Sequence, residues 1–303
     1  MIDLSIIILS WNTCDLLEKC LNSVNEFGGG LDFEILVIDN GSVDGSQRMV
    51  SQKFPQVRLV ANEENLGFAR GNNKGFALTT SPFILLLNSD AFLTAGALDC
   101  LLGTMKQKPK AGIVGGHLLN PDGSFQASHS LFPGLWQEFL ILTGLGRLIF
   151  GRFYPSRGPE VEKGPQNVDY VEGACLLVRR EATEQAGLLS EDFFMYSEEV
   201  NWCFAMKKAR WEVWYHPEAR IIHYGGASSK NRRTSREGDL YRSRVIFFRK
   251  NYGPKKAFLL KWMIVIMVGI KQVVHGILRS LSGGGKGRVV ISMSELMEKM
   301  RGV

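Results

Sequence analysis

The 303-residue chain lacks several features that would assign it to common protein classes. Its five cysteines are scattered and include no C-x-x-C pair, so we expect neither a disulfide framework nor a zinc ribbon, and a reducing compartment is favoured. There is no G-x-G-x-x-G, no G-x-x-x-x-G-K-[ST] and no G-x-S-x-G. These absences argue against a dinucleotide fingerprint, a P-loop and an acyl-transfer nucleophile elbow.

Targeting and membrane-spanning segments are also missing by the usual sequence criteria. The N-terminus has no basic region and no small-residue cleavage site, and residues 4–9 are typical of a buried first strand. No apolar stretch reaches the roughly 18–20 charge-free residues of a spanning helix. We therefore expect a cytoplasmic protein.

Acidic residues are scarce at the C-terminal end. Residues 226–303 carry 17 Lys/Arg against 4 Asp/Glu, a net charge of +13, whereas residues 1–225 carry 19 against 26, a net charge of −7. The two parts sum to +6. This asymmetry indicates an anionic partner for the C-terminal region, either membrane headgroups or nucleic acid.

Short, almost entirely apolar runs alternate with helical spacing in the first hundred residues. This alternation predicts an α/β fold with a parallel sheet covered on both faces by helices. Ligand sites in such sheets lie beyond the carboxyl ends of the strands, where Asp39 and Asp90 stand. Between residues 120 and 168 we expect long loops, because Gly, Pro and aromatic residues are frequent there. The expected strands are 4–9, 34–38, 57–61, 83–87, 113–119, 171–179 and 212–215, and the expected helices are 14–24, 46–54, 71–79, 180–186 and 200–209.

Two polar segments follow expected strands. Asp39 closes a buried strand, where a carboxylate can accept a hydrogen bond from a base N–H or a ribose hydroxyl; the residues after it are equally typical of a turn. In Asn88-Ser89-Asp90 the first and third side chains project the same way on an extended backbone. Such an oxygen pair can hold Mg²⁺ or Mn²⁺, although a strand end before a helix explains the segment as well.

Two further segments carry groups that are suited to proton transfer or metal binding. Glu198 and Glu199 open an expected helix beside several aromatic residues; they suit the positive helix end and could also serve as a general base. His223 follows an apolar strand and precedes a Gly pair that permits close backbone approach. A single histidine in this position is more often structural than a ligand.

The order of these segments resembles that of the family 2 glycosyltransferases, in particular the bacterial rhamnosyltransferase-like branch. The resemblance covers residues 3–255 and implies a GT-A fold: a Rossmann-like, mostly parallel sheet with helices on both faces. The matching segments are SIIILSWN at 5–12, EILVIDNGSVDGS at 34–46, ENLGFARGNNKG at 64–75, ILLLNSDAFL at 84–93, VEGACLLVRRE at 171–181, the segment at 193–228 that begins FFMYSEEVNW, and YRSRVIFFRKNYGP at 241–254.

The resemblance implies a role for each candidate residue. Asp39 falls on the position that contacts the nucleobase N3–H, and Asn40 and Asn72 belong to the same nucleotide-sugar site. Asn88 and Asp90 fall on the metal-binding D-x-D motif in its N-x-D form.

On the acceptor and metal sides, the resemblance implies that Asp90 and His223 bind Mg²⁺ or Mn²⁺. It further implies that Glu199, or alternatively its neighbour Glu198, is the base. In the family this acid pair is Glu-Asp, so Glu199 is one methylene longer than the family's residue.

The expected activity is that of a metal-dependent, inverting glycosyltransferase of the hexosyltransferase type in cell-surface polysaccharide synthesis. The donor is a nucleotide-diphospho-sugar, with dTDP-rhamnose favoured, and the acceptor is a saccharide or a lipid-linked saccharide. The alternatives are a non-catalytic sugar-binding scaffold on the same fold, suggested by Asn88 and Glu199, and a nucleic-acid-binding protein. Long apolar runs in the basic tail disfavour nucleic acid.

The chain divides, in this interpretation, into a catalytic domain at 1–228 and a basic, amphipathic region at 229–303. Taken as a helix, residues 257–281 carry a wide apolar face and one polar stripe. These features predict a helix that lies in an anionic membrane surface, peripheral on the inner face of the cell membrane; the alternative is a helix packed on the catalytic domain. The stripe comprises Lys261, Lys271, Gln272, His275 and Arg279.

Overall fold

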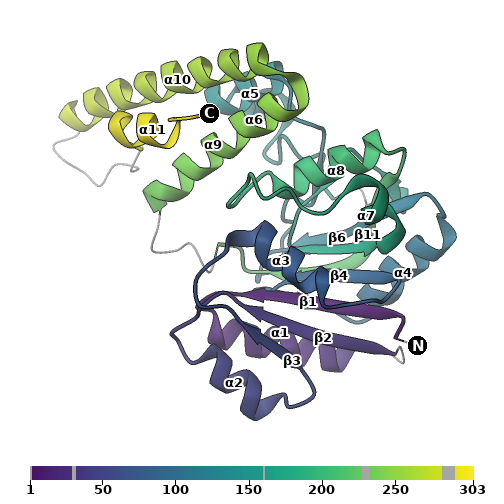
Figure 1. Cartoon of the computed structure of the whole chain (residues 1–303). Helices are drawn as coiled ribbons and strands as arrows, with labels where there is room; N and C mark the ends of the chain where they lie inside the picture. Colours follow the sequence, from purple (N-terminus) through teal and green to yellow (C-terminus); the bar gives the residue numbers. More distant parts are fainter. Residues whose placement is uncertain (1, 29–31, 160, 227–232, 282–290) are drawn as a thin grey trace. The chain divides into compact units, whose positions relative to one another are not determined.

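The computed structural model describes residues 2–28, 32–159, 161–226, 233–281 and 291–303 (Figure 1). The expected domain boundary after residue 228 and the glycine-rich segment 282–285 lie outside these residues. The chain forms two compact units. The sheet unit contains Met1–Phe132, Ser156–Glu191 and Glu198–Ser228, and the helical unit contains Pro133–Pro155, Asp192–Ser197 and Ser229–Val303. The helical unit thus combines the C-terminal region with two segments from within the first 228 residues.

The described part of the sheet unit contains a nine-stranded sheet in the order β3-β2-β1-β4-β10-β6-β11-β5, with β8 paired to β11. Strands β1 to β4 run parallel, as do β6 and β11, whereas β10 lies antiparallel between β4 and β6. The predicted α/β class with a mostly parallel sheet is confirmed. The strands are β1 (Leu4–Ser10), β2 (Phe33–Asp39), β3 (Arg58–Ala61), β4 (Phe83–Asn88), β5 (Ala91–Leu93), β6 (Ala111–Leu119), β8 (Gln166–Asn167), β10 (Cys175–Arg179) and β11 (Glu212–His223), while β7 (His129–Ser130) and β9 (Tyr170–Val171) pair separately.

Helices cover both faces of the sheet because successive side chains of each strand point to opposite faces. In β1, Ile6 and Ile8 pack into one hydrophobic cluster and Ile7 into the other. The first cluster includes residues of α1 (Cys14–Phe27), α2 (Ser46–Lys53) and α4 (Ala97–Gln107). The second includes residues of α3 (Gly67–Ala77), α7 (Arg180–Ala186) and α8 (Glu198–Lys208) (Figure 1).

Helix α3 lies unusually close to β1. A Cβ atom on Gly75 would come within 2.7 Å of Cγ2 of Ile7, and Gly71 packs against Leu9 in the same way. The helix begins at Gly67, four residues before the expected start, and Gly67 has a φ of +78° that favours glycine. The sequence pattern missed this first turn.

The helical unit contains α5 (Leu135–Thr143) and α6 (Leu145–Phe150), where long loops were expected. That expectation is wrong for these residues, which form two apolar helices. A single residue, Gly144, separates the two helices, and its φ is +79°. Within the unit, the buried carboxylate of Glu138 on α5 accepts a hydrogen bond from Arg244 at 2.9 Å. Arg244 belongs to α9 (Arg233–Tyr252), which is followed by α10 (Pro254–Leu281) and α11 (Met293–Lys299).

Helix α10 buries one face within the helical unit and exposes another. Its polar stripe contacts the C-terminal segment: Lys261 Nζ donates to the carbonyl oxygens of Met300 and Val303 at 2.9 and 3.1 Å, and Gln272 Nε2 donates to that of Ile291 at 2.6 Å. The buried face consists of Ala257, Leu260, Ile264 and Val268, and the exposed apolar side chains are Phe258, Leu259, Trp262, Ile266, Ile270, Val273, Val274 and Ile277.

Candidate active site

Three parallel strands bring candidate residues to one edge of the sheet. Asp39 pairs with Ser10 at the end of β1, and Asn88 pairs with Leu9 on its other side. Because neighbouring strands lie about 4.8 Å apart, Asp39 and Asn88 stand roughly 10 Å apart across β1. Thr13, just after β1, shares a hydrogen bond of 2.8 Å with the buried hydroxyl of Ser89. This bond fixes the segment between Asn88 and Asp90 to the first loop.

Asp39 is fully buried, and its two carboxylate oxygens differ. Oδ1 accepts hydrogen bonds from the Ser42 main-chain N–H at 2.9 Å and from Gln47 Nε2 at 2.7 Å. Oδ2 has no partner among the described residues. A buried acceptor without a donor is costly, so Oδ2 is suited to an external N–H or O–H group.

Asn40 follows Asp39 directly, and Asn72 lies on α3. Both side chains are buried. The Asn40 amide donates to the Gly67 carbonyl at 3.2 Å and accepts from Asn62 at 2.9 Å, so it joins β2 to the start of α3. Asn72 Nδ2 donates to the Phe68 carbonyl of its own helix at 3.0 Å. These contacts position the loops around Asp39, and the predicted contacts with a nucleotide sugar remain predictions.

His223 and Asp90 meet through the pairing of β5 and β11. The antiparallel register places His223 opposite Ala91, which follows Asp90 directly. As a result His223 Nε2 lies 3.4 Å from Asp90 Oδ1, and both side chains are largely buried. An imidazole nitrogen and a carboxylate oxygen at this separation suit two ligands of one divalent cation. The predicted pair of metal ligands is therefore brought together, and its donor atoms fit Mg²⁺ or Mn²⁺.

Glu198 and Glu199 occupy the first turn of α8, whose position is set by Trp202. The indole N–H of Trp202 donates to the Gly187 carbonyl at 2.8 Å, and its ring meets the Phe76 ring edge-on at 5.7 Å. Burial raises the pKa of Glu199 to about 7. Burial, followed by the charge of Glu199, raises the pKa of Glu198 well above its usual range.

A third acid, Glu172, belongs to this group and was not singled out from the sequence. Burial, and secondarily the charge of Glu199, raises its pKa to about 8. The adjacent Gly173 lies beside Glu199: a Cβ at Gly173 would make an ordinary van der Waals contact with the Glu199 Cβ at 3.5 Å. The signal that could have found Glu172 is the glutamate in VEGACLLVRRE, which stands between two strands of a matching segment. The pKa values of Glu199 and Glu172, about 7 and about 8, lie close to neutral pH, where a general base works best.

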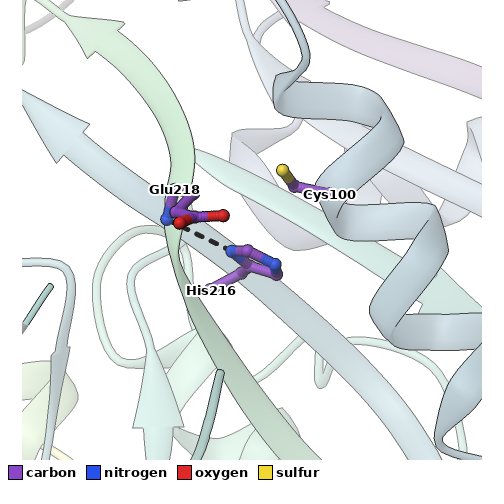
Figure 2. Close-up of side chains that lie close together, drawn as sticks. All are labelled: Cys100, His216 and Glu218. Carbon is purple, nitrogen blue, oxygen red and sulfur yellow. Dashed lines mark hydrogen bonds between the residues drawn. The ribbon is translucent and has the colours of Figure 1, made fainter. Parts of the chain in front are cut away.

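One other cluster of possible metal ligands occurs among the described residues: Cys100 on α4 with His216 and Glu218 on β11 (Figure 2). Their ligand atoms lie within 4.8 Å of one another. The Glu218 main-chain N–H donates to His216 Nδ1 at 3.2 Å, which uses the lone pair of that nitrogen. Burial, and then the charge of Glu218, raises the pKa of the Cys100 thiol, which therefore holds its proton at neutral pH. We accordingly base the metal assignment on Asp90 and His223.

Comparison with known proteins identifies the family. The model of glycosyl transferase family 2 matches residues 5–187. The chain belongs to this family. It is 27% identical over 279 residues to the N-acetylglucosaminyl-diphospho-decaprenol L-rhamnosyltransferase of Mycobacterium tuberculosis, covering 86% of this chain and 89% of the relative. It is 25% identical to the low-salt glycan biosynthesis hexosyltransferase Agl10 of Haloferax volcanii, covering 90% and 87%.

Solved structures of this family 2 transferase's fold include two that were determined with a nucleotide and Mn²⁺. The mannosyltransferase PcManGT from Pyrobaculum calidifontis, in complex with GDP-Man and Mn²⁺, aligns with a TM-score of 0.57 at 15% identity, covering 98% of this chain and 78% of that one. GalNAc-T7 with UDP, GalNAc and Mn²⁺ aligns with a TM-score of 0.56 at 13% identity, covering 73% and 42%. At these identities the likeness shows the GT-A fold.

Proposed function

We propose that this family 2 glycosyltransferase moves a hexose-type sugar from a nucleotide-diphospho-sugar to a saccharide or lipid-linked acceptor, with inversion at the anomeric carbon. The observation that carries the proposal is the pairing of His223 with Asp90 at the sheet edge, in the unit that also holds Asp39 and the three glutamates at positions 172, 198 and 199. The relative in Mycobacterium tuberculosis, an L-rhamnosyltransferase by name, supports rhamnose as the sugar. For this chain we further propose dTDP-rhamnose as the donor and cell-surface polysaccharide synthesis as the process.

The donor's nucleobase would be held by Asp39. Its buried Oδ2 needs a hydrogen-bond donor, and the N3–H of thymine or uracil is one. Gln47 and the Ser42 amide occupy Oδ1 and so hold the carboxylate in one orientation.

Asp90 and His223, with Asn88 beside them, would hold a divalent cation at the donor's diphosphate. When bound, this cation supplies Lewis-acid stabilisation of the charge that develops on the leaving nucleoside diphosphate. Asp90 contributes the carboxylate of the segment, and Thr13 keeps that segment in place through Ser89.

Glu199 would take the proton from the attacking acceptor hydroxyl. With a pKa of about 7, its carboxylate is ionised in a large fraction of molecules at neutral pH yet basic enough to hold a transferred proton. A single displacement needs no protein nucleophile, so one base is sufficient for inversion. Within the pair we assign the base role to Glu199, because burial and the charge of Glu199 raise the pKa of Glu198 well above its usual range and so favour the protonated form of Glu198.

We also propose that the helical unit binds an anionic membrane, so that the enzyme works on the inner face of the cell membrane. By length and composition α10 is apolar enough over Pro254–Ile277 to cross a membrane, with a mean hydropathy of 1.9 and 22% of its apolar window buried. The sequence criterion of roughly 18–20 charge-free residues did not mark this helix as a spanning candidate, because Lys261 and Lys271 interrupt its apolar run.

An interfacial position for α10 is supported by where its charges lie. The stripe with Lys261 and Gln272 binds the C-terminal segment, and the opposite face exposes eight large apolar side chains. Lys255 and Lys256 are exposed at its start, and residues 240–294 contain no acidic residue. An exposed apolar face on a helix that itself carries basic and no acidic residues suits a surface of anionic lipid.

A binding screen tests the catalytic part of the proposal. Thermal unfolding is followed with dTDP-, UDP- and GDP-sugars, each with and without Mn²⁺. The proposal predicts stabilisation by at least one thymine or uracil nucleotide sugar, and a larger shift with Mn²⁺. A protein that none of these ligands stabilises, with or without the metal, would contradict it and favour a non-catalytic scaffold.

A further inference from the structure

Gln126 contacts the candidate metal ligand His223 at two points, although the sequence pattern gave it no role. Its Oε1 lies 2.6 Å from His223 Nδ1, and its Nε2 donates to the His223 main-chain carbonyl at 3.1 Å. The same Nε2 donates to Asn120 Oδ1 at 3.0 Å. Gln126 is itself anchored, because its main-chain N–H donates to the Leu118 carbonyl at the end of β6.

The orientation of the Gln126 amide follows from this network. A main-chain carbonyl can only accept, so the end of the amide that faces the His223 carbonyl must be the NH₂ group. Asn120 is oriented by the same reasoning, since its Nδ2 donates to the Phe125 carbonyl at 3.3 Å and leaves Oδ1 as the acceptor. Both contacts of Gln126 Nε2 therefore agree, and Oε1 must face the imidazole.

The orientation of Gln126 in turn selects the tautomer of His223. An amide oxygen carries no proton, so Nδ1 of His223 must be the donor in the 2.6 Å contact. Neutral His223 then has its lone pair on Nε2, the nitrogen that lies 3.4 Å from Asp90 Oδ1. Two acceptors that face each other repel, and a cation that both can bind removes the repulsion.

We propose that Gln126 is a positioning residue for the metal site: it holds His223 in the Nδ1–H form, so that Nε2 and Asp90 together accept a divalent cation. The inference rests on the metal role in the proposed function. It adds a residue that acts on the metal site through its two contacts with His223. Partners of this kind typically change metal affinity 10- to 100-fold when they are removed.

The test compares three variants by Mn²⁺ titration, read from the EPR signal of free Mn²⁺, alone and with dTDP. Gln126→Leu removes the acceptor for Nδ1 and should weaken Mn²⁺ binding about 10-fold or more. Gln126→Glu keeps an oxygen opposite Nδ1 but loses the N–H donor to the His223 carbonyl and Asn120, so it should bind Mn²⁺ more tightly than Gln126→Leu does. Gln107→Leu, at an exposed glutamine near the end of α4, is the matched control and should bind as the wild type does.

A second readout does not depend on the metal. In ¹⁵N-histidine-labelled protein, the His223 signals should show the Nδ1–H form in the wild type and in Gln126→Glu, and a shift toward Nε2–H in Gln126→Leu. Wild-type Mn²⁺ affinity and an unchanged tautomer in Gln126→Leu would overturn the positioning role alone. A wild-type protein that binds no Mn²⁺ would instead overturn the metal role, and the proposed function with it.

Discussion

Gln47 Nε2 donates to Oδ1 of Asp39 at 2.7 Å and leaves the buried Oδ2 without a partner among the described residues. One carboxylate oxygen thus fixes the orientation of the side chain, and the other is the oxygen that we propose for a ligand. The pairing crosses from the end of β2 to the first turn of α2, so the sheet and helix together set its geometry. The proposed nucleobase site can therefore be tested by measuring its selectivity directly.

The first prediction concerns this oxygen. Asp39→Asn should weaken binding of dTDP or UDP about 10- to 100-fold, because a hydrogen bond to a charged acceptor contributes roughly 1.5–3 kcal/mol. Calorimetry with a nucleotide methylated at N3 provides the control, since this ligand lacks the N–H. The wild type should discriminate strongly against the methylated nucleotide and the variant should not. Equal wild-type affinity for both nucleotides would exclude the contact.

The second prediction concerns the base. Glu199→Gln should lower kcat about 10²- to 10⁴-fold while nucleotide-sugar binding survives, because the amide cannot accept the proton. The kcat/KM of the wild type should decrease as the pH is lowered through about 7, because Glu199 becomes protonated. Glu198→Gln is the matched control and should retain much more activity. If Glu198→Gln is inactive and Glu199→Gln active, the two roles must be exchanged.

The third prediction concerns stability and Glu172. Its pKa is about 8 in the folded protein against an ordinary value of 4.5, so the folded state keeps a proton that the unfolded state loses. Between about pH 4.5 and 8 the free energy of unfolding should therefore decrease as pH rises. Glu172→Gln removes this titration, and urea unfolding at pH 5 and pH 8 should show a smaller decrease. A decrease as large as in the wild type would contradict the assignment.

The sequence predicted the strand ends but not the contacts between them. Asp39 and the Asn88–Asp90 segment follow apolar runs, so their places at the carboxyl ends of β2 and β4 could be read directly. The meeting of His223 with Asp90 depends on the antiparallel register of β5 and β11, which no local pattern encodes. Gln126 was missed for the same reason, because its partner is distant in the chain.

The irregular middle of the chain was the least predictable part. Glycines at positions 134, 144 and 151 indicate loops, yet all three bound α5 and α6 and allow the apolar segments between them to form helices. The polar stripe of α10 was predicted from its periodicity alone. The contacts of this stripe could not be predicted in the same way, because Lys261 and Gln272 donate to main-chain carbonyl groups of the C-terminal segment, which is distant in sequence.

The fourth prediction concerns the exposed face of α10. The double variant Ile266→Glu with Val273→Glu should release the protein from anionic vesicles in a sedimentation assay, because it places two acids on the apolar face. Nucleotide binding should be unchanged. Leu188→Glu, at an exposed apolar position in the sheet unit, is the control and should still sediment. Wild-type protein that does not bind anionic vesicles at low salt would refute the membrane proposal.

The most direct test of the account is sugar transfer by the wild type and by Asp90→Asn. Labelled dTDP-rhamnose and other nucleotide sugars are supplied with Mn²⁺ and a membrane extract that contains lipid-linked acceptors. The account predicts transfer by the wild type and a fall of about 10³-fold or more in Asp90→Asn, which loses the carboxylate ligand while keeping its shape. Transfer by Asp90→Asn at the wild-type rate, or wild-type transfer that persists in a chelator, would contradict the cation site at Asp90 and His223.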